Sequence, residues 1–181
     1  MLRYNPRMQI KKTAILGVYA LVLEPIEDER GYFMRTFGRE ALLEHGIDFE
    51  IVQANQSLTK QKGSIRGMHF QQEPKQEDKL VQCVNGAIYD VALDLRPDSP
   101  TYRQWHGEEL SDKNHTMLLV PKGCAHGFQT LTDNCLMQYY ISESYAPDLS
   151  SGVRWDDPAF NITWPLGATV LSEKDQSWPL Q

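Results

Sequence analysis

The chain has 181 residues, of which 41% are hydrophobic and 23% are charged, and its formal net charge is −6. Non-specific binding to nucleic acid depends on clustered Lys and Arg, so this acidic balance argues against a nucleic-acid partner. A chain of this length can bury a sufficient core, and we expect residues 1–181 to form a single domain.

Cysteine usage and hydropathy bear on the cellular compartment. The cysteines Cys83, Cys124 and Cys135 are odd in number and form no C-x-x-C, which argues against a disulfide framework and against a structural zinc site. We expect a cytoplasmic protein, because thiols stay reduced there. No apolar run approaches the length needed to cross a bilayer, so we expect no membrane partner.

In chain order, the first half of the sequence predicts a strand, one helix and a hairpin. Residues Thr13–Leu23 follow two lysines, but no small-residue cleavage site follows them, which favours a β-strand over a signal peptide. Only Arg39–His45 has the composition of a helix, and Gly46 would end it. Two β-rich runs between Leu80 and Leu95 flank Asn85-Gly86, which predicts a hairpin with a type I′ turn.

The second half predicts further short strands. In the second strand of the predicted hairpin, one face is core-like and the other carries Asp90 and Asp94, so this strand could line a polar cavity. A turn is expected at Arg96–Pro100, and the tail after Trp164 has an irregular pattern. The other predicted strands are Tyr102–Leu110, Thr116–Val120, Ala125–Leu131 and Leu136–Ser142. Strands at this spacing indicate a sandwich or a barrel.

Ionisable residues interrupt these strand-like segments. His69 lies among hydrophobic neighbours, where a lone histidine is most simply a hydrogen-bonded structural residue. Arg66, Lys79 and His126 occur in similar surroundings, and His126 follows a Pro-x-Gly turn of the kind that starts a barrel strand. Their joint presence predicts a polar pocket inside an all-β shell.

The pattern G-x-H-x-Q followed by P-x-G-x-x-H resembles the two motifs of the cupin superfamily. This resemblance implies an all-β fold, a cupin-type double-stranded β-helix (jelly-roll barrel) with few short helices. Metal-binding cupins carry H-x-H and a downstream Glu, whereas this chain has Gln71 at the second position, and Glu73 and Glu77 fall off the usual spacing. At most two nitrogen ligands remain, and a catalytic metal generally needs three protein ligands, so we expect no metal.

Over nearly its whole length the chain resembles the dTDP-4-dehydrorhamnose 3,5-epimerase family. The matching segments are Asp28–Phe33, Gln53–Ser57, Arg66–Gln71, Lys79–Val81, Asp98–Thr101 with Gln104-Trp105, Pro121–Phe128, Trp155–Pro158 and Leu171–Asp175. Members epimerise nucleotide-linked 4-keto-6-deoxyhexoses without a cofactor or a metal. The resemblance therefore implies a cofactor-independent isomerase that inverts C3, C5 or both, in deoxysugar biosynthesis such as that of lipopolysaccharide O-antigen.

The resemblance also assigns catalytic roles. His69 matches the base that removes a ring proton, since an imidazole with a pKa of about 6.5 is largely neutral near pH 7. Asp175 matches the carboxylate partner of this base, Lys79 matches the residue that faces the developing enolate oxygen, and Tyr139 matches the acid across the sugar ring. Without the resemblance, Asp175 would be read as a solvated tail residue, and Tyr139 as an aromatic chosen for β-propensity.

Binding roles follow in the same way. Arg30 and Arg66 match contacts to the diphosphate, for which a guanidinium is well suited. The other predicted substrate-binding residues are Gln53 and Asn55 near the nucleotide, His126 in the same cavity, and Lys174 beside the catalytic carboxylate.

Three positions depart from the family pattern. Arg35 stands where many members have Glu, Ala54 replaces the middle Asp of Gln-Asp-Asn, and Ser144 stands where an aromatic often packs on the nucleobase. The expected substrate is therefore a nucleoside-diphosphate 4-keto-6-deoxy sugar linked to either dTDP or CDP. A homodimer is also implied, because members exchange N-terminal strands and complete each pocket with a partner residue.

Two other functions remain open at the level of sequence. One is a cupin that binds a sugar nucleotide without chemistry, which would need neither the base nor the acid. The other is a metal-dependent cupin enzyme, which elemental analysis of the purified protein would detect.

Overall fold

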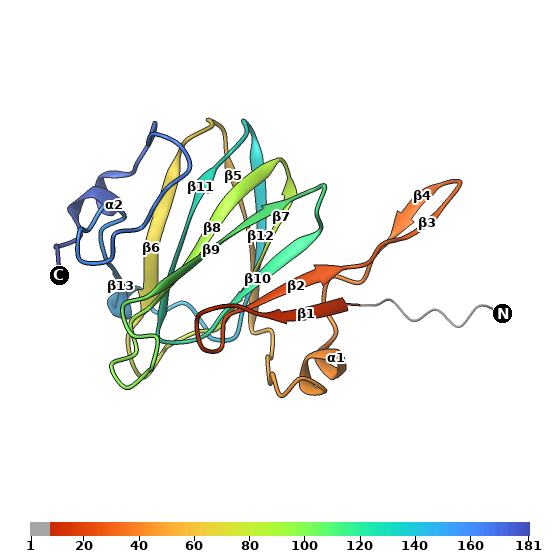
Figure 1. The fold of residues 1–181 in the computed structure, drawn as a ribbon, viewed down its shortest axis with the longest axis horizontal. Coiled ribbons are helices and arrows are strands. Elements are labelled where there is room, and N and C mark those ends of the chain that lie inside the picture. The colour runs from red at the N-terminus through yellow and green to blue at the C-terminus, as the bar shows by residue number, and fades with distance from the viewer. Residues whose placement is uncertain (1–7) are drawn as a thin grey trace.

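The computed structural model describes residues 8–181, and antiparallel strands dominate this part of the chain (Figure 1). In chain order the strands are β1 (Met8–Lys12), β2 (Tyr19–Leu23), β3 (Ile26–Asp28), β4 (Gly31–Phe33), β5 (Gln53–Thr59), β6 (Ile65–Gln71), β7 (Lys79–Asn85), β8 (Ala87–Asp94), β9 (Trp105–Ser111), β10 (Thr116–Val120), β11 (Cys124–Thr130), β12 (Cys135–Ile141) and β13 (Ser150–Gly152). The helices are α1 (Arg39–Leu43), a 3₁₀ turn (Pro147–Leu149) and α2 (Glu173–Ser177). No helix in the described residues is long and apolar enough to cross a membrane.

Two sheets form the body of the molecule. One has the strand order β1-β2-β10-β7-β12-β5 and the other the order β13-β6-β11-β8-β9, and every recorded pairing is antiparallel. From β5 onward the chain passes from one sheet to the other at almost every connection. This is the connectivity of a jelly roll, and the predicted fold class is confirmed.

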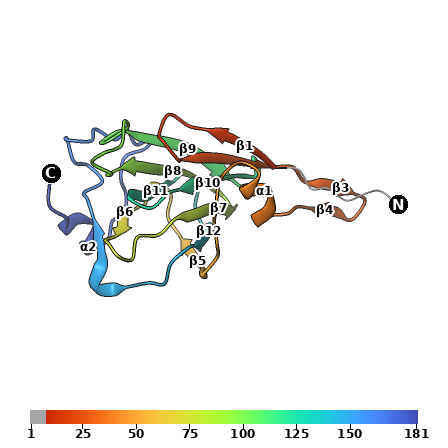
Figure 2. The same cartoon turned by 90° about the horizontal axis from the view of Figure 1, so that it is seen from below.

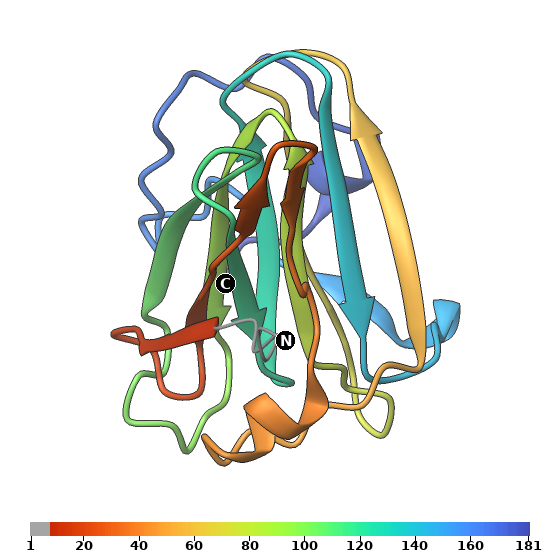
Figure 3. The same ribbon diagram turned by 90° about the vertical axis from the view of Figure 1, so that its right-hand side faces the viewer.

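The core has an inner layer and two outer layers. The inner cluster joins both sheets, with Val81 and Leu118 from one and Ile88 and Phe128 from the other. A second cluster covers the outer face of the first sheet and includes Leu42 of α1, the short orange helix at one end of the sheets in Figure 3. A third cluster covers the outer face of the other sheet with the segment around residues 153–164. Both faces of each sheet are therefore partly covered, and polar groups inside the barrel need partners.

Most predicted strands agree with the observed ones to within a few residues. Thr116–Val120 is confirmed at both ends, while the strand expected at Thr13–Leu23 is shorter and spans Tyr19–Leu23. The predicted helix is confirmed as α1, and Gly46 follows it with a positive φ of 75°. The irregular tail is confirmed except for α2.

The predicted hairpin between Leu80 and Leu95 is wrong in its pairing. Strands β7 and β8 lie where expected, but β7 pairs with β10 and β12, whereas β8 pairs with β9 and β11. Gly86 adopts a positive φ of 84°, and the chain there passes from one sheet to the other. The predicted type I′ turn is also wrong, because it needs a positive φ at both central residues and Asn85 does not have one. The Asn-Gly signal marks a bend between the strands, and both edges of each strand are occupied by strands that are distant in sequence.

A ribbon of β3 and β4 extends away from the body of the molecule (Figures 1 and 2). Its apolar side chains include Ile26 and Tyr32, which are 43% and 58% exposed. Such side chains at the end of a projecting arm are unusual for a surface that faces only water.

The turn after β8 is held by a buried carboxylate. Asp94 is fully buried and accepts hydrogen bonds from both arms of the Arg96 guanidinium at 2.8 Å and from the hydroxyls of Ser99 and Thr101 at 2.6 Å. Burial alone would raise the pKa of Asp94, but these hydrogen bonds outweigh it and hold the pKa well below its usual range. Arg96 also donates to the Leu16 carbonyl, so the ion pair ties this turn to the loop before β2.

Replacing Asp94 with Asn should reduce the free energy of unfolding at pH 7 by about 3 kcal/mol, because the Arg96 guanidinium loses its buried partner. Because the pKa of Asp94 is lowered in the folded state, the carboxylate contributes stability above the unfolded-state value of about 3.9, and this contribution is lost as the pH falls below it. Urea denaturation of both proteins should show a large difference at pH 7 that shrinks toward pH 3. A difference that stayed constant with pH would contradict this role.

Candidate active site

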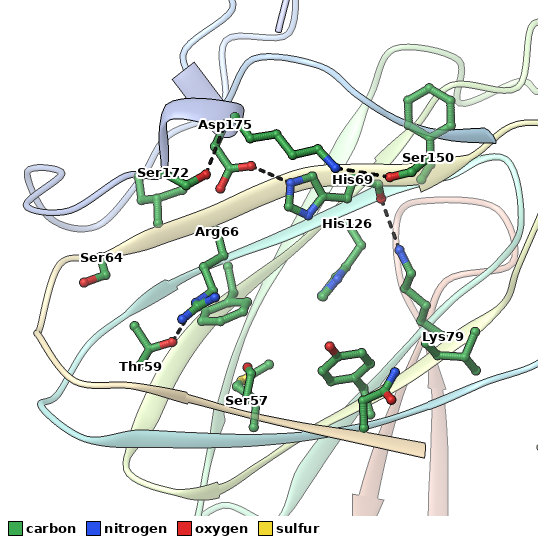
Figure 4. Close-up of a pocket in the computed structure, with 18 of the residues that line it drawn as sticks. Ser57, Thr59, Ser64, Arg66, His69, Lys79, His126, Ser150, Ser172 and Asp175 are labelled. Carbon is green, nitrogen blue, oxygen red and sulfur yellow. Dashed lines mark hydrogen bonds and ion pairs between the residues drawn. The ribbon is translucent and has the colours of Figure 1, made fainter. Parts of the chain in front are cut away.

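A cavity of about 1090 Å³ opens between the two sheets and the C-terminal segment (Figure 4). Residues from β5, β6, β7, β11 and β12 line it, together with residues 170–175. Nine of the ten predicted site residues line this cavity: Gln53, Asn55, Arg66, His69, Lys79, His126, Tyr139, Lys174 and Asp175. The volume is at the upper end of the usual range for ligand sites, roughly 300–1,000 Å³, which leaves room for an elongated ligand.

The closest polar contact in the cavity joins His69 to Asp175. The distance from Nε2 of His69 to Oδ1 of Asp175 is 2.5 Å, and Asp175 is only 3% exposed. The Asp175 backbone N–H donates to the Ser172 hydroxyl at 3.0 Å, so Ser172 caps α2 and fixes where its carboxylate points. A carboxylate 106 positions away in the chain is thus brought to the middle of β6.

This contact sets the chemistry of the imidazole. With Nε2–H donated to Asp175, Nδ1 is left as the hydrogen-bond acceptor, and Figure 4 shows this second ring nitrogen turned toward the cavity. Burial acts to raise the pKa of Asp175, but hydrogen bonds from His69 and Ser172 and the charge of His69 lower it overall. The carboxylate is therefore ionised at neutral pH and can stabilise a positive charge on the ring.

Lys79 enters the cavity from the start of β7. Its ammonium lies 3.0 Å from Oε1 of Glu77 and donates to the His69 carbonyl at 3.2 Å. The side chains of Lys79 and Glu77 are only 12% and 6% exposed, so this ion pair lies in a largely dehydrated place. A cation next to the His69 backbone can meet negative charge that develops on a ligand in the cavity.

A second histidine–carboxylate pair lies on the neighbouring strands. His126 is opposite His69 in the β6–β11 register, and its Nε2 is 2.8 Å from Oδ1 of Asp90. Asp90 is fully buried, and burial raises its pKa while the nearby His126 and Lys79 oppose that rise. No residue of β8 lines the cavity, so the prediction that this strand lines it is wrong, and Asp90 acts on the cavity only through its pair with His126.

The roles of Glu77 and Asp90 were not recognised in the sequence. Glu77 was considered only as a metal ligand and set aside, and Asp90 only as part of a mixed strand face. For Asp90 the available signal was an acidic residue among the apolar residues of a strand, where a buried charge requires a partner. Glu77 lies in the loop before β7 and carried no such signal.

Tyr139 lies on β12, opposite Asn55 of β5 in the register. Its hydroxyl environment is dehydrated, and burial raises the pKa of Tyr139, partly opposed by the charge of Arg66. Tyr140 faces the other side of the sheet, where its ring packs 6.2 Å from that of Phe37. The two neighbouring tyrosines therefore point to opposite faces of the sheet, and Tyr139 is kept in the protonated form that an acid needs.

Arg66 is oriented by β5. Its Nε donates to the Thr59 hydroxyl at 2.9 Å and its Nη2 is 3.4 Å from the Leu58 carbonyl. These bonds leave other N–H groups of the guanidinium without a recorded protein partner, although the residue lies in the cavity wall. A partly held guanidinium of this kind is suited to bind an anion.

Gln71 stands where metal-binding cupins have their second histidine, and here it holds a loop. Its amide donates to the carbonyls of Lys75 at 2.8 Å and Ser144 at 3.3 Å and accepts from the Ala146 N–H at 2.6 Å. The loop so fixed carries Tyr145, which lines the cavity, whereas Ser144 does not. The departure inferred at Ser144 therefore does not leave this edge of the cavity without an aromatic ring.

Arg30 is the predicted site residue that the fold of this chain does not bring to the cavity. It lies at the turn between β3 and β4, pairs with Asp28, and its side chain is 90% exposed. The arm that carries it points away from the body of the same chain (Figure 2).

A metal site requires several ligand side chains that converge on one point. Among residues 8–181, no group of three or more His, Cys, Asp or Glu side chains is arranged so that it could hold a metal ion. His69 and His126 each direct one ring nitrogen to a carboxylate, and the Gln71 amide is occupied by backbone groups. The donor set here is that of paired ionisable residues rather than of a coordination shell.

The fold and the cavity together define a cupin-type jelly roll with ionisable side chains at its centre. A family model for dTDP-4-dehydrorhamnose 3,5-epimerase matches residues 12–181. The enzyme of that name from Methanothermobacter thermautotrophicus is 44% identical over 170 residues, which cover 92% of this chain and 91% of the relative. The chain therefore belongs to the dTDP-4-dehydrorhamnose 3,5-epimerase family, whose named members are isomerases.

Solved structures agree with this assignment. A crystal structure of dTDP-4-dehydrorhamnose 3,5-epimerase from Bacillus anthracis with TDP and PPi bound superposes with a TM-score of 0.93 at 43% identity, covering 97% of this chain and 100% of that one. The dTDP-6-deoxy-D-glucose-3,5-epimerase from Legionella pneumophila in complex with dTDP-4-keto-L-rhamnose has a TM-score of 0.91 at 37% identity, covering 96% and 93%.

The buried Lys79–Glu77 pair generates a stability prediction. Lys79→Met should lower the free energy of unfolding by about 3–5 kcal/mol, because it leaves the Glu77 carboxylate buried without a counter-charge. The double variant Lys79→Met/Glu77→Gln should recover most of that loss in urea denaturation.

The Lys75–Glu143 pair provides a matched control, since its side chains are 43% and 29% exposed. Lys75→Met should lower stability by less than about 1 kcal/mol. If Lys79→Met were as mild as this control, the Lys79–Glu77 pair would not be the buried charge pair described here.

Proposed function

We propose that the protein epimerises a dTDP-linked 4-keto-6-deoxyhexose at C3 and C5, without a cofactor. The single observation that carries this proposal is the His69–Asp175 pair, whose free imidazole nitrogen faces a cavity that also holds Lys79 and Tyr139. Membership of the family supports the reaction class, and relatives with bound TDP and dTDP-4-keto-L-rhamnose support the kind of substrate.

The proposed chemistry follows from the carbonyl at C4 of the sugar. This ketone acidifies the hydrogens on C3 and C5, so a base can remove one of them as a proton. Nδ1 of His69 takes the proton, and the ionised Asp175 stabilises the imidazolium that forms. The two electrons of the broken C–H bond become those of an enolate, whose negative oxygen lies toward the Lys79 ammonium. One such preorganised donor typically lowers the barrier by about 3–4 kcal/mol.

Inversion requires that the proton returns from the opposite face of the ring. Tyr139 lies on the facing sheet, and its raised pKa keeps its hydroxyl protonated at neutral pH. The phenol gives its proton to the carbanionic carbon and the enolate collapses to the ketone with inverted configuration. The tyrosinate and the imidazolium that remain then exchange protons with solvent before the next step.

Binding of the nucleotide uses the other cavity residues. Arg66 is the candidate for the diphosphate, and Gln53 and Asn55 for the nucleoside, in line with their places in the cavity wall. Lys174 and His126 are assigned to the sugar, on either side of the base. The Tyr145 ring at the cavity edge offers a face on which a nucleobase can stack.

A deuterium experiment tests the proposal. Incubation in deuterium oxide with dTDP-4-keto-6-deoxyglucose should place deuterium at C3 and C5 and invert both carbons, as read by NMR. His69→Ala should abolish the exchange at both positions, since no other base replaces it. The CDP-linked sugar serves as the comparison and should react more slowly, and a preference for it would identify Arg35 and Ala54 as marks of a different nucleotide.

Other outcomes distinguish the alternative functions. Binding without any exchange by the wild-type protein would favour the non-catalytic sugar-nucleotide-binding cupin. Exchange that persists in His69→Ala would reject the assigned base. Stoichiometric iron, manganese or zinc in the active protein would favour the metal-dependent reading.

Tyr139→Phe should separate the two halves of the reaction. Proton abstraction by His69 does not need the phenol, so deuterium exchange should fall less than about 10-fold, whereas completed inversion should fall by about 100- to 10,000-fold. NMR that follows exchange and configuration in the same sample measures both. Turnover equal to that of wild type would remove Tyr139 from the mechanism.

We further propose that the protein is a homodimer in which Arg30 reaches the partner's cavity. The observations that support this are the projecting β3–β4 arm, its exposed apolar side chains, and the distance in the fold between Arg30 and its own cavity. Contact with the diphosphate would then be completed by a residue of the second copy.

Mixing two inactive variants tests this arrangement. Arg30→Ala and His69→Ala each disable every pocket of their own homodimer, but a mixed dimer has one pocket with both residues intact if Arg30 acts in the partner. Unfolding and refolding the two variants together should restore about a quarter of wild-type activity, because half of randomly paired dimers are mixed and each has one working pocket. If Arg30 acts within its own chain, mixing restores nothing.

The proposal also covers the domain organisation and the cellular location of the protein. Residues 1–181 are taken as one domain, and the reaction is placed in the cytoplasm, in the supply of deoxysugars for surface polysaccharides such as O-antigen. The three cysteines are free and buried, which fits a reducing compartment.

A further inference from the structure

Trp178 follows directly after α2 and lies behind the catalytic pair rather than in the cavity. Its ring contacts the His69 ring edge-on, with 6.5 Å between centroids and an angle of 66° between planes. Trp178 is absent from the cavity lining, whereas His69 and Asp175 are both part of it. The indole therefore contacts the base on the side that the substrate does not reach.

The barrel provides a space for this ring at one specific glycine. Gly152 of β13 is the register partner of His69, and a Cβ built on Gly152 would lie 2.4 Å from Cε2 of the Trp178 indole. The same Cβ would also lie 2.7 Å from the Met68 carbonyl oxygen, so no side chain larger than hydrogen fits there without a shift of both the indole and the backbone of β6. The Trp178 Nε1 is buried and has no hydrogen-bond partner among the described residues, so the ring is held by shape and not by a polar bond.

The same indole also contacts a predicted substrate-binding residue. The Lys174 ammonium lies 5.5 Å from the Trp178 ring centroid, within the range of a cation–π contact, and 3.4 Å from the Ser150 hydroxyl. Lys174 directly precedes Asp175 in the chain. Trp178 therefore contacts both the histidine that donates the hydrogen bond and the neighbour of the aspartate that accepts it.

The helix that carries Asp175 needs such support. It has five residues, which is too short to be stable alone, and Asp175 is its only buried residue. Ser172 fixes its beginning, and beyond Trp178 the backbone N–H of Gln181 donates to the buried Asp157 at 2.7 Å. Between these two anchors, Trp178 is the large side chain that presses the end of the helix against β6 and β13.

We propose that Trp178 is a positioning residue that holds the Asp175 carboxylate and the His69 imidazole in hydrogen-bond register. Its effect on turnover rests on the function proposed above, but its effect on the pair does not. A displacement of about 1 Å in such a pair can reduce a rate by about 100-fold.

The test has a part that needs no substrate. The proton in the His69–Asp175 hydrogen bond should give a resolved downfield NMR signal in the full-length protein, shielded from exchange with water. Trp178→Leu removes the flat ring and should broaden or abolish this signal, whereas Trp178→Phe keeps a ring and should retain it. Leu180→Ala changes an exposed tail residue (53% exposed) and should leave the signal unchanged.

Gly152→Ala provides a second route, because its added Cβ would meet the indole at 2.4 Å and the Met68 carbonyl oxygen of β6 at 2.7 Å while Trp178 itself is kept. It should weaken the signal as Trp178→Leu does, so the proposal stays testable even if Trp178→Leu folds poorly. Retention of the wild-type signal in both folded variants would overturn the proposal.

Kinetics provide the second part. In the epimerase assay, Trp178→Leu and Gly152→Ala should lower kcat by about 10- to 100-fold with KM changed less than about threefold, and Trp178→Phe should restore most of kcat. Wild-type kcat in Trp178→Leu would overturn the catalytic consequence. A wild-type protein without epimerase activity would reject the proposed function alone, since the NMR comparison still decides the role of Trp178.

Discussion

One hydrogen bond, from His69 on β6 to Asp175 on α2, determines what the rest of the structure must achieve. A carboxylate can direct an imidazole only if both are held at hydrogen-bond distance. Here the Asp175 side chain is 5% exposed, while that of His69 is 38% exposed and borders the cavity. The two residues lie 106 positions apart, so the whole chain has to fold before they meet. The jelly roll fixes the histidine, and the C-terminal segment brings the carboxylate to the open side of the barrel.

The cavity around this bond is a set of buried charges in which nearly every group has a partner. Lys79 is paired with Glu77 and His126 with Asp90, while Arg66 is held by Thr59. Each charged side chain loses hydration when it is buried, and its partner compensates for that loss. A polar cavity can therefore exist between two sheets whose faces are otherwise covered by apolar clusters. The unpaired oxygens of Glu77 and Asp90 are exceptions among the described residues, and both lie beside this cavity. A site that removes and returns protons needs such groups close together, at the expense of some stability.

Much of the fold could be predicted from local sequence, because strand propensity and alternation act within a few residues. The strand Thr116–Val120 and the helix ended by Gly46 were identified in this way. Pairing was not predictable from the same signals: Asn85-Gly86 marks a bend and not the predicted hairpin turn, and β7 and β8 belong to different sheets because distant strands occupy their edges. Local turn chemistry does not determine which sheet a strand joins.

The site divides along the same line. His69, Lys79 and His126 could be suspected from charge within apolar strands, whereas Asp175 in an irregular tail was assigned only through family resemblance. Glu77, Asp90 and Trp178 act through other side chains, and no spacing in the sequence connects them to their partners.

The central claim is that His69 and Tyr139 act on opposite faces of one hexose ring. The most direct measurement is a crystal structure with an unreactive dTDP-6-deoxyhexose that has a hydroxyl at C4. The account predicts His69 Nδ1 on one face of the ring, the Tyr139 hydroxyl on the other, and the Lys79 ammonium within hydrogen-bond distance of O4. A ring with both side chains on the same face, or one bound outside the cavity, would contradict it.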